Sequence, residues 1–327
     1  MIEGYTLWQT LGHKEKEIWN HLVRPEVFRE SLLLPHPDSH KGDNGRVLVV
    51  GGSPLFHGAG HLATKSADKI NSAITTIIDF SSRTNDMVYF CSTPHNLLIQ
   101  QAQCDTFIGI TRSQFDAYFS KCDAVLVGPG LMREADIGRP DTEGESNFTR
   151  MITDRVLSSD KKTVLDAGSL QVISSESLRG KNRVIITPHR VEMKNLFGFD
   201  NDHYFFVSQN AEFSQIETVA QRVQAIAEEF KITILLKGPI DIIAGSSGWF
   251  FSPGGSPAMT KGGTGDVLAG VCAALYSRIN EPLVAAAAAS YILKRTGENL
   301  QEEKSQFFDA GDLADNITRV LIQIFAK

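Results

Sequence analysis

Short apolar runs rich in β-branched residues recur along this chain, and longer amphipathic segments separate them. Continuous apolar runs of this length are typical of strands buried on both faces of a parallel sheet, because a strand with one solvated face alternates apolar and polar residues. The pattern therefore predicts an α/β fold with a parallel sheet. The predicted strands are Val47–Val50, Ile74–Ile78, Ala124–Val127, Thr163–Leu165, Val184–Ile186 and Ile232–Leu236.

The second half of the chain carries the clearest helical pattern. From Ser208 to Phe230, apolar residues recur at three- and four-residue steps, which is the spacing of one helix face. Two further runs, Ile240–Ala244 and Trp249–Phe251, predict a local antiparallel hairpin. The rest is expected to be helical over Gly265–Tyr276, Pro282–Thr296 and Asp309–Phe325.

The chain of 327 residues has room for one large α/β domain or for two smaller ones. Residues 1–40 are polar and mixed, with prolines near the end, and we interpret them as an N-terminal arm. Residues 41–327 form the predicted catalytic domain. Within it, the polar stretch Arg133–Ser146 predicts an exposed loop.

Composition excludes several classes of partner. The formal net charge is −6, so no basic excess indicates binding to nucleic acid or to an anionic membrane. The longest stretch of small apolar residues, Leu283–Leu293, is too short to span a bilayer. The four cysteines form no C-x-x-C pair and no basic-apolar leader is present, which favours a cytoplasmic location.

The segment Lys261-Gly-Gly-Thr-Gly-Asp266-Val-Leu-Ala-Gly270 is a glycine-rich turn that leads into an apolar helix. Glycines let backbone N–H groups approach a ligand, and a helix N-terminus favours anions, so the turn suits a phosphate. Asp266 is placed to take a proton from a hydroxyl that attacks phosphorus. In the other interpretation, Asp266 caps the helix and the glycines form a surface turn.

A second glycine-rich segment, Gly51–Gly60, follows a predicted strand. Within it and beyond, Gly58-Ala-Gly-His-Leu-Ala63 matches the G-x-G-x-x-A pattern of dinucleotide-binding proteins, and Asp79 ends the next strand. A Rossmann dehydrogenase is therefore an alternative. Residues Ser53 to His57 lengthen the loop before the pattern, which argues against it.

Polar or glycine-bearing loops follow several other predicted strands. In open α/β sheets, ligands bind beyond the carboxyl ends of the strands. These loops together predict one crevice for an extended phosphorylated ligand, and no P-loop motif is present. The segments are Leu126–Gly130, Val164–Gly168, Thr187–Glu192 and Leu236–Pro239.

The order of these segments resembles that of the NAD(P)H-hydrate dehydratases. Asp38–Gly42 followed by Gly45–Ser53 resembles the opening of that family, and the resemblance covers about residues 35–325. The remaining segments follow in the family's order: Gly58-Ala59, Val127–Gly130, Val164–Ala167, Thr187–Glu192, Leu236–Gly238 and Gly262–Gly270.

The resemblance implies a ribokinase-like three-layer α/β/α sandwich with a mostly parallel central sheet. It also implies an enzyme that repairs NADH or NADPH to which water has added across a ring double bond. ADP or ATP donates a phosphoryl group to the ring hydroxyl, and phosphate is then eliminated. Phosphate is a good leaving group and hydroxide a poor one, so the nucleotide drives the dehydration.

The resemblance assigns roles to residues at matching positions. Asp266 becomes the base, and the backbone of Gly262, Gly263, Thr264 and Gly265 becomes an anion hole. Glu192 is expected to orient Mg²⁺ through water. The hydrated cofactor is assigned to Ala59, Gly130, His189 and Asp266. The adenine nucleotide is assigned to Lys237, Gly238, Pro239, Ile240, Asp241 and Gly265.

The chain departs from the family pattern at three other positions. Gly168 stands where the family commonly has a second acid, Lys261 where it has a small residue, and Phe56 where it has a tyrosine. Lys261 either adds charge for a phosphate or hinders the turn. Asp266 and its glycines are intact, so the departures bear on substrate affinity more than on fold.

The resemblance also implies partners. Many relatives carry an N-terminal epimerase domain, for which forty residues are too few, so a separate epimerase is expected to act in the same pathway. Relatives commonly form dimers or tetramers, which implies a homo-oligomer. Two alternatives stay open: a ribokinase-type small-molecule kinase, and a non-catalytic homologue that binds nucleotide.

Overall fold

The computed structural model describes residues 15–32, 34–40, 43–53, 56–70, 74–79, 97–101, 112–133, 142–198 and 207–326. Of the four cysteines, Cys91 and Cys104 lie outside these ranges. Cys122 and Cys272 are free and buried. Among the described residues, no helix is both long and apolar enough to cross a bilayer.

The described residues form one central sheet of nine strands, in the order β3-β2-β1-β4-β5-β6-β7-β8-β9. Neighbouring strands from β3 to β7 are parallel. Strand β8 runs antiparallel to both of its neighbours, β7 and β9. The strands are β1 (Arg46–Gly51), β2 (Ile74–Asp79), β3 (Leu97–Gln101), β4 (Ala124–Val127), β5 (Lys162–Leu165), β6 (Val184–Ile186), β7 (Thr233–Leu236), β8 (Asp241–Gly245) and β9 (Gly248–Ser252).

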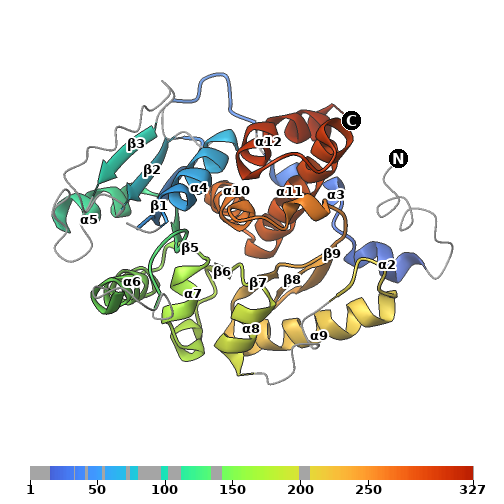
Figure 1. Ribbon diagram of the computed structural model, residues 1–327, viewed down its shortest axis with the longest axis horizontal. Coiled ribbons are helices and arrows are strands. Elements are labelled where there is room, and N and C mark those ends of the chain that lie inside the picture. Colours follow the sequence, from blue (N-terminus) through green and yellow to red (C-terminus); the bar gives the residue numbers. More distant parts are fainter. Residues whose placement is uncertain are drawn as a thin grey trace.

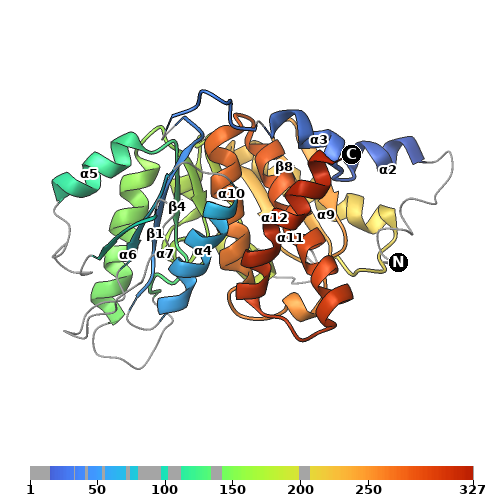
Figure 2. The same cartoon turned by 90° about the horizontal axis from the view of Figure 1, so that it is seen from above.

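Helices cover both faces of this sheet, so the molecule has three layers (Figure 1). One face carries α4 (His57–Lys69), α10 (Thr264–Arg278), α11 (Pro282–Lys304) and α12 (Ala310–Phe325). The other carries α5 (Arg112–Lys121), α6 (Thr142–Leu157), α7 (Gly168–Val172), α8 (Arg190–Phe197) and α9 (Phe213–Phe230). Figure 2 looks onto the first of these faces. The predicted three-layer α/β/α sandwich is confirmed.

Two hydrophobic clusters lie on either side of the sheet, as the predicted strand pattern requires. Strand β4 is fully buried, and its side chains alternate between the clusters: Val125 and Val127 in one, Leu126 in the other. Helix α10 is buried from Val267 to Ser277. This helix carries Asp266 in its first turn, so a largely buried helix positions the predicted base.

The described part of the predicted N-terminal arm packs onto the domain. Three residues, beginning with Leu22, join the helices α2 (Glu15–His21) and α3 (Pro25–Phe28). Leu22 forms a parallel β-bridge with Phe251 of β9. The N–H of Val23 donates to the Phe251 carbonyl at 2.9 Å, and the His21 ring stacks on Trp249 with centroids 3.7 Å apart. The arm thus covers the edge strand β9, which otherwise presents unpaired backbone groups.

The predicted hairpin and the four predicted helices are present, with boundaries shifted by a few residues. α9 begins at Phe213 instead of Ser208, and α11 continues to Lys304. Strand β3 was not predicted. The expectation of a loop over Arg133–Ser146 is wrong at its C-terminal end, because α6 begins at Thr142, while residues 134–141 lie outside the described ranges.

Candidate functional site

The carboxyl ends of the parallel strands and the N-terminus of α10 meet at one edge of the sheet. Gly128 and Gly130 follow β4, Asp166 follows β5, Thr187 follows β6 and Lys237 follows β7. Parallel strands end at the same edge, so segments far apart in sequence are brought together there. The crevice predicted from the strand-end motifs therefore corresponds to a real cluster of loops.

Asp266 lies in the first turn of α10 and does not cap it. The N-cap is Gly263, whose φ of +96° falls in the left-handed region, and α10 has no side-chain cap bond. A glycine is required there for a second reason, since a Cβ on Gly263 would approach Leu62 to 2.7 Å. The alternative interpretation of Asp266 as a cap is thus wrong. The Asp266 residue is half-buried.

The pKa of the Asp266 carboxyl is raised to about 7. Burial is the largest cause, because it disfavours the charged form. The Asp166 carboxylate raises the pKa further, Lys237 opposes the shift, and Glu192 adds to it. A carboxylate with a pKa this close to neutrality accepts a proton far more readily than an ordinary aspartate does.

We expect this pKa to set the acid side of the pH profile. In the free enzyme, kcat/KM should rise tenfold per pH unit below about pH 7 and level off above it, because only ionised Asp266 accepts a proton. Steady-state rates at limiting substrate between pH 5 and 9 measure this. A profile flat down to pH 5 would contradict the assignment.

A buried ion pair lies beside Asp266. The Lys237 amine is 2.7 Å from Oδ1 of Asp166, which is 1% exposed, and the same oxygen accepts the Thr187 hydroxyl at 2.8 Å. Burial alone lowers the pKa of the Lys237 amine, but the carboxylates of Asp166, Glu192 and Asp266 hold it above its usual value. The amine therefore carries a fixed positive charge at the site.

Asp166 belongs to one of the strand-end segments, Val164–Gly168, but the sequence pattern indicates no role for it. Its signal was an acidic residue directly after a buried strand, two strands away from Lys237 in the sheet. The pair spans β5, β6 and β7 because Thr187, at the end of the middle strand, completes it. Register between parallel strands, which the sequence does not reveal, brings these groups within bonding distance.

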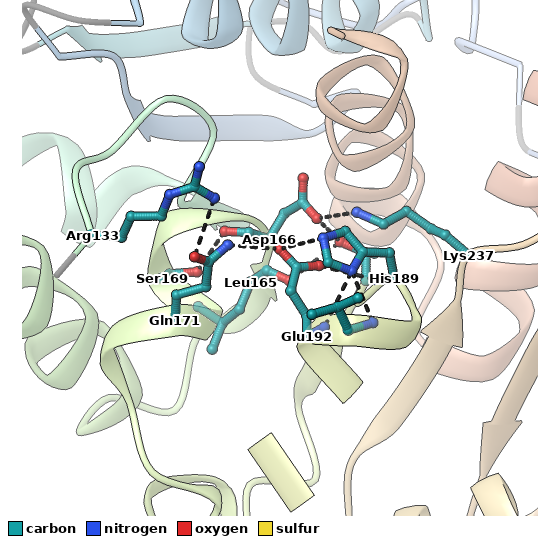
Figure 3. A network of polar contacts seen from close by, with 10 residues as sticks. Arg133, Leu165, Asp166, Ser169, Gln171, His189, Glu192 and Lys237 are labelled. Atoms are coloured by element: carbon teal, nitrogen blue, oxygen red, sulfur yellow. Dashed lines mark hydrogen bonds and ion pairs between the residues drawn. The ribbon is translucent and has the colours of Figure 1, made fainter. Parts of the chain in front are cut away.

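Glu192 and His189 form the cap of α8 (Figure 3). Nδ1 of His189 accepts the N–H of Glu192 at 3.1 Å, and Oε2 of Glu192 accepts the N–H of His189 at 2.9 Å. Oε1 of Glu192 accepts from the Gln171 amide at 3.1 Å, and Arg133 donates to the Gln171 carbonyl oxygen at 3.2 Å. A chain of polar contacts thus leads from the β4 loop to Glu192.

A cavity of about 700 Å³ opens beside Lys237 and the first turn of α10. Its walls are the loop after β7, the loop after β9, the start of α10 and one side of α11. Such a volume is typical of a small-molecule site. Of the residues assigned to the nucleotide, the cavity is lined by Lys237, Gly238, Pro239, Asp241, Thr264 and Gly265.

Three other assigned residues lie elsewhere. Ile240 is 2% exposed and lines a smaller neighbouring cavity of about 130 Å³. Gly262 and Gly263 belong to the turn that precedes α10. His189 lines both cavities.

Ala59 and Gly130 lie against each other, as their shared assignment requires. Gly130 has a φ of +73°, and a Cβ there would come within 3.0 Å of the Ala59 Cβ and 2.7 Å of the Phe56 carbonyl oxygen. The first turn of α4 and the loop after β4 therefore make a close backbone approach that only glycine permits.

The contacts of Lys261 show whether this residue hinders the glycine-rich turn. Its amine donates to the carbonyl of Phe308 at 2.7 Å and to that of Gln306 at 3.3 Å, between α11 and α12. The stem lines the cavity, but the charge is directed away from the glycine-rich turn. Lys261 therefore leaves that turn intact.

Gly168 leaves no room for the acid that the family pattern has at this position. A Cβ on Gly168 would lie 2.3 Å from the Leu131 carbonyl oxygen. We expect Gly168→Ala to lower the free energy of unfolding by about 1–3 kcal/mol, because the β4 loop must shift. Thermal denaturation checks this against Gly58→Ala, where a Cβ meets nothing; an unchanged melting temperature for Gly168→Ala would contradict it.

The Rossmann alternative is wrong. Gly58 and Gly60 lie inside α4, which begins at His57, whereas a dinucleotide fingerprint needs its glycines in the turn between strand and helix. The close approach in this chain occurs at Gly130 and Gly263 instead. The mostly parallel sheet with a glycine-rich helix start at its carboxyl edge defines a protein of the ribokinase-like class.

Solved structures confirm that class. A ribokinase-like superfamily protein of Enterococcus faecalis V583 superposes with a TM-score of 0.72 at 20% identity, covering 93% of this chain and 96% of that one. The ADP/ATP-dependent NAD(P)H-hydrate dehydratase from Bacillus subtilis, co-crystallised with ATP and Mg²⁺, superposes with a TM-score of 0.68 at 25% identity, covering 93% and 98%.

Sequence comparison gives the family. The NAD(P)H-hydrate dehydratase profile matches residues 47–319. The ADP-dependent (S)-NAD(P)H-hydrate dehydratase of Cenarchaeum symbiosum strain A is 33% identical over 300 residues, which is 92% of this chain and 96% of that relative. The chain therefore belongs to the NAD(P)H-hydrate dehydratase family, and the resemblance seen in the ordered motifs is confirmed.

Proposed function

We propose that this protein dehydrates hydrated NADH or NADPH, with ADP or ATP as phosphoryl donor. The observation that carries the proposal is the Asp266 carboxylate, with a pKa of about 7, in the first turn of α10 beside the fixed charge of Lys237. Gly265, the residue before Asp266, lines the 700 Å³ cavity. Ala59 and Gly130 lie against each other, and we assign the hydrated cofactor to them.

In the first step, Asp266 takes the proton of the ring hydroxyl as its oxygen attacks the terminal phosphorus of the nucleotide. An O–P bond forms, and the bond from phosphorus to the bridging oxygen of the nucleotide breaks. Backbone N–H groups from Gly262 to Gly265, which no helical carbonyl satisfies, hold the transferred phosphoryl oxygens. Lys237 neutralises negative charge that develops on them.

In the second step, the C–O bond to the new phosphate breaks and the phosphate leaves with the bonding electron pair. The neighbouring ring carbon gives a proton to water, and its electron pair restores the double bond. Inorganic phosphate and the dihydronicotinamide are the products. Asp266 is neutral after the first step and must release its proton before the next turnover. Its pKa of about 7 lets that release occur near neutral pH.

We assign the adenine nucleotide to the cavity and the hydrated cofactor to the side of Ala59 and Gly130. The cavity is lined by Gly265, in the first turn of α10, and by the apolar side chain of Leu293 on α11. We therefore assign the phosphates to the start of α10 and the base to the α11 side of the cavity. His189 lines the cavity, so we move its proposed contact from the hydrated cofactor to the boundary between the two ligands.

The acidic residues at the site suit Mg²⁺ held through water. Both oxygens of Glu192 already accept one hydrogen bond each, and the described residues contain no cluster of three ligating side chains. Mg²⁺ commonly keeps several waters and binds substrate phosphates with one or two carboxylates. Glu192 would thus orient the ion's water shell, and the bound ion would neutralise the nucleotide phosphates.

The chemistry of the substrate supports a partner enzyme. The Cenarchaeum symbiosum relative is named for the (S) configuration of the hydrate, and an enzyme selective for one configuration leaves the other untouched. We propose that an NAD(P)H-hydrate epimerase supplies the reactive form, and that both enzymes act in the cytoplasm. We also propose that the chain forms a homo-oligomer, which its mass in solution tests.

The deciding experiment follows absorbance of reduced nicotinamide at saturating hydrated NADH, MgCl₂ and either ADP or ATP. We expect recovery of that absorbance with release of one phosphate per turnover, and parallel reactions give the preferred donor. A stable phosphorylated product without recovery would instead indicate a small-molecule kinase. Binding of nucleotide without any turnover would indicate a non-catalytic homologue, and both results would overturn the proposed function.

A further inference from the structure

The helix α11 carries three buried polar side chains on one face, and one of them, Lys294, lines the proposed nucleotide cavity. Ser290, Lys294 and Glu298 are four residues apart and therefore share one helix face. All three are buried, at 0%, 7% and 3% exposure. Polar groups buried to this degree need partners, because an unpaired one destabilises the fold. Their partners lie in the two loops that form the cavity walls.

The Lys294 amine is surrounded by oxygen atoms. It lies 3.1 Å from the Gly238 carbonyl, 3.0 Å from that of Pro239 and 3.5 Å from that of Gly254. Oδ1 of Asp241 is 3.4 Å away. Three carbonyl dipoles and one carboxylate directed at a point form the kind of environment that binds a hard cation.

This amine joins two loops that are distant in sequence. Gly238 and Pro239 follow β7, whereas Gly254 follows β9. The first loop is also tied down by Asp241, which accepts the N–H of Gly238 at 2.9 Å and the Ser290 hydroxyl at 2.7 Å. The same cavity is lined by both loops and by Lys294 itself.

Glu298 holds the second loop from the next turn of α11. Its carboxylate accepts the N–H of Gly255 at 3.3 Å and the Arg295 guanidinium at 2.8 Å. A Cβ on Gly254, where φ is +100°, would lie 2.2 Å from Oε1 of Glu298. The glycines thus allow the loop backbone to reach the helix, where the charged side chains fix it.

We propose that Lys294 is a positioning residue that acts as a tethered monovalent cation, bracing the two loops that form the walls of the nucleotide site. The inference rests on the proposed nucleotide site. A covalently attached cation saves the entropy of capturing a free ion and keeps the loops in their binding geometry before the nucleotide arrives. Nucleotide affinity should therefore depend on the charge at this point, and the chemical step should not.

Removal of the amine tests the proposal in the full chain. In Lys294→Ala, we expect the Kd and KM for ADP or ATP to rise about tenfold or more, the equivalent of one lost charged hydrogen bond. We expect kcat at saturating nucleotide and the KM for hydrated cofactor to stay within about twofold, because Asp266 is untouched. Lys304→Ala, on the same helix but with an amine paired to exposed Asp312, is the matched control.

Chemical rescue separates a cation from mere packing. Ammonium or methylammonium chloride should restore nucleotide affinity to Lys294→Ala, whereas tetramethylammonium chloride at equal ionic strength should not. Lys294→Met fills the space without the charge, so it should lose affinity and resist rescue. Loss of affinity in Lys294→Ala that ammonium does not reverse would overturn the tethered-cation role, as would unchanged affinity in Lys294→Met.

Binding and turnover measured separately distinguish this proposal from the proposed function. Isothermal titration with ADP alone tests the brace without requiring dehydratase activity. Wild-type protein that binds ADP in a Lys294-dependent way but never restores hydrated NADH would support the brace and overturn the function. Wild-type protein that binds neither ADP nor ATP would overturn both.

Discussion

Asp266→Asn should lower kcat by about 10²–10⁴-fold, the range that a positioned general base contributes. Asparagine keeps the shape of the side chain and cannot take the hydroxyl proton. Nucleotide affinity should stay within about twofold, because the glycine-rich turn and Lys237 are unchanged. Turnover of hydrated NADH, together with titration of ADP, measures both quantities. Wild-type turnover in this variant would remove the base from the proposed mechanism.

Stability distinguishes lost chemistry from lost structure in Asp266→Asn. The folded-state pKa of about 7 lies above the ordinary value of 3.8, so the folded protein binds the proton more tightly than the unfolded chain. Ionisation of Asp266 therefore reduces stability as pH rises from about 4 to 7, and the full penalty remains above that range. At pH 8, Asp266→Asn should melt at or above the temperature of the wild type.

The chain offers a matched control for Asp266. Asp312 is the third residue of α12, as Asp266 is of α10, and a glycine precedes each. Asp312 lies on the surface, where its carboxylate pairs with Lys304. Asp312→Asn should therefore retain wild-type turnover, and an equal loss in both variants would indicate a general effect of removing a helix-start carboxylate.

Lys237→Met should lower kcat/KM by about 10²–10³-fold, the effect of removing one group that stabilises transition-state charge. The substitution removes the cation beside Gly265, where an added Cβ would lie 3.4 Å from the Lys237 amine. It also leaves Asp166 buried without its partner at 2.7 Å. Initial rates with ADP and with ATP measure the loss.

The pH profile gives Lys237→Met a signature that misfolding does not produce. Lys237 lowers the pKa of Asp266, so removal of the amine should raise that pKa above about 7 and shift the acid limb of kcat/KM to higher pH. Lys65→Met, whose amine pairs with Asp315 on the surface, should change neither rate nor profile. An acid limb at the wild-type position would show that the two groups are not coupled.

Much of the fold could be predicted because buried strands and helices have recognisable patterns of apolar residues. Strands buried on both faces are apolar along most of their length, so β1, β4, β5, β6 and β7 could be predicted. Strand β3, Leu97–Gln101, ends in two glutamines and carries no such pattern. The start of α6 at Thr142 was also missed, because its first turns are polar.

The site residues were predicted in groups, and the tertiary structure decided which groups meet. Lys237, Gly238, Pro239, Asp241 and Gly265 gather at one cavity, as their shared assignment required. His189, whose ring caps α8 directly after β6, lines the same cavity. Residue order alone does not show these contacts, because they depend on how the strand ends are arranged across the sheet.

The sequence by itself determined the class of fold, the family and the glycine-rich turn before Asp266, because these depend on short-range patterns and on their order. Only the tertiary structure revealed Asp166 beside Lys237 at 2.7 Å and Lys294 among three carbonyls of two distant loops. The pKa of Asp266 depends on its burial and on Asp166, Lys237 and Glu192. Electrostatic coupling acts through space over a few ångströms, so it is set by the packing of strands and helices and is not visible in the order of residues.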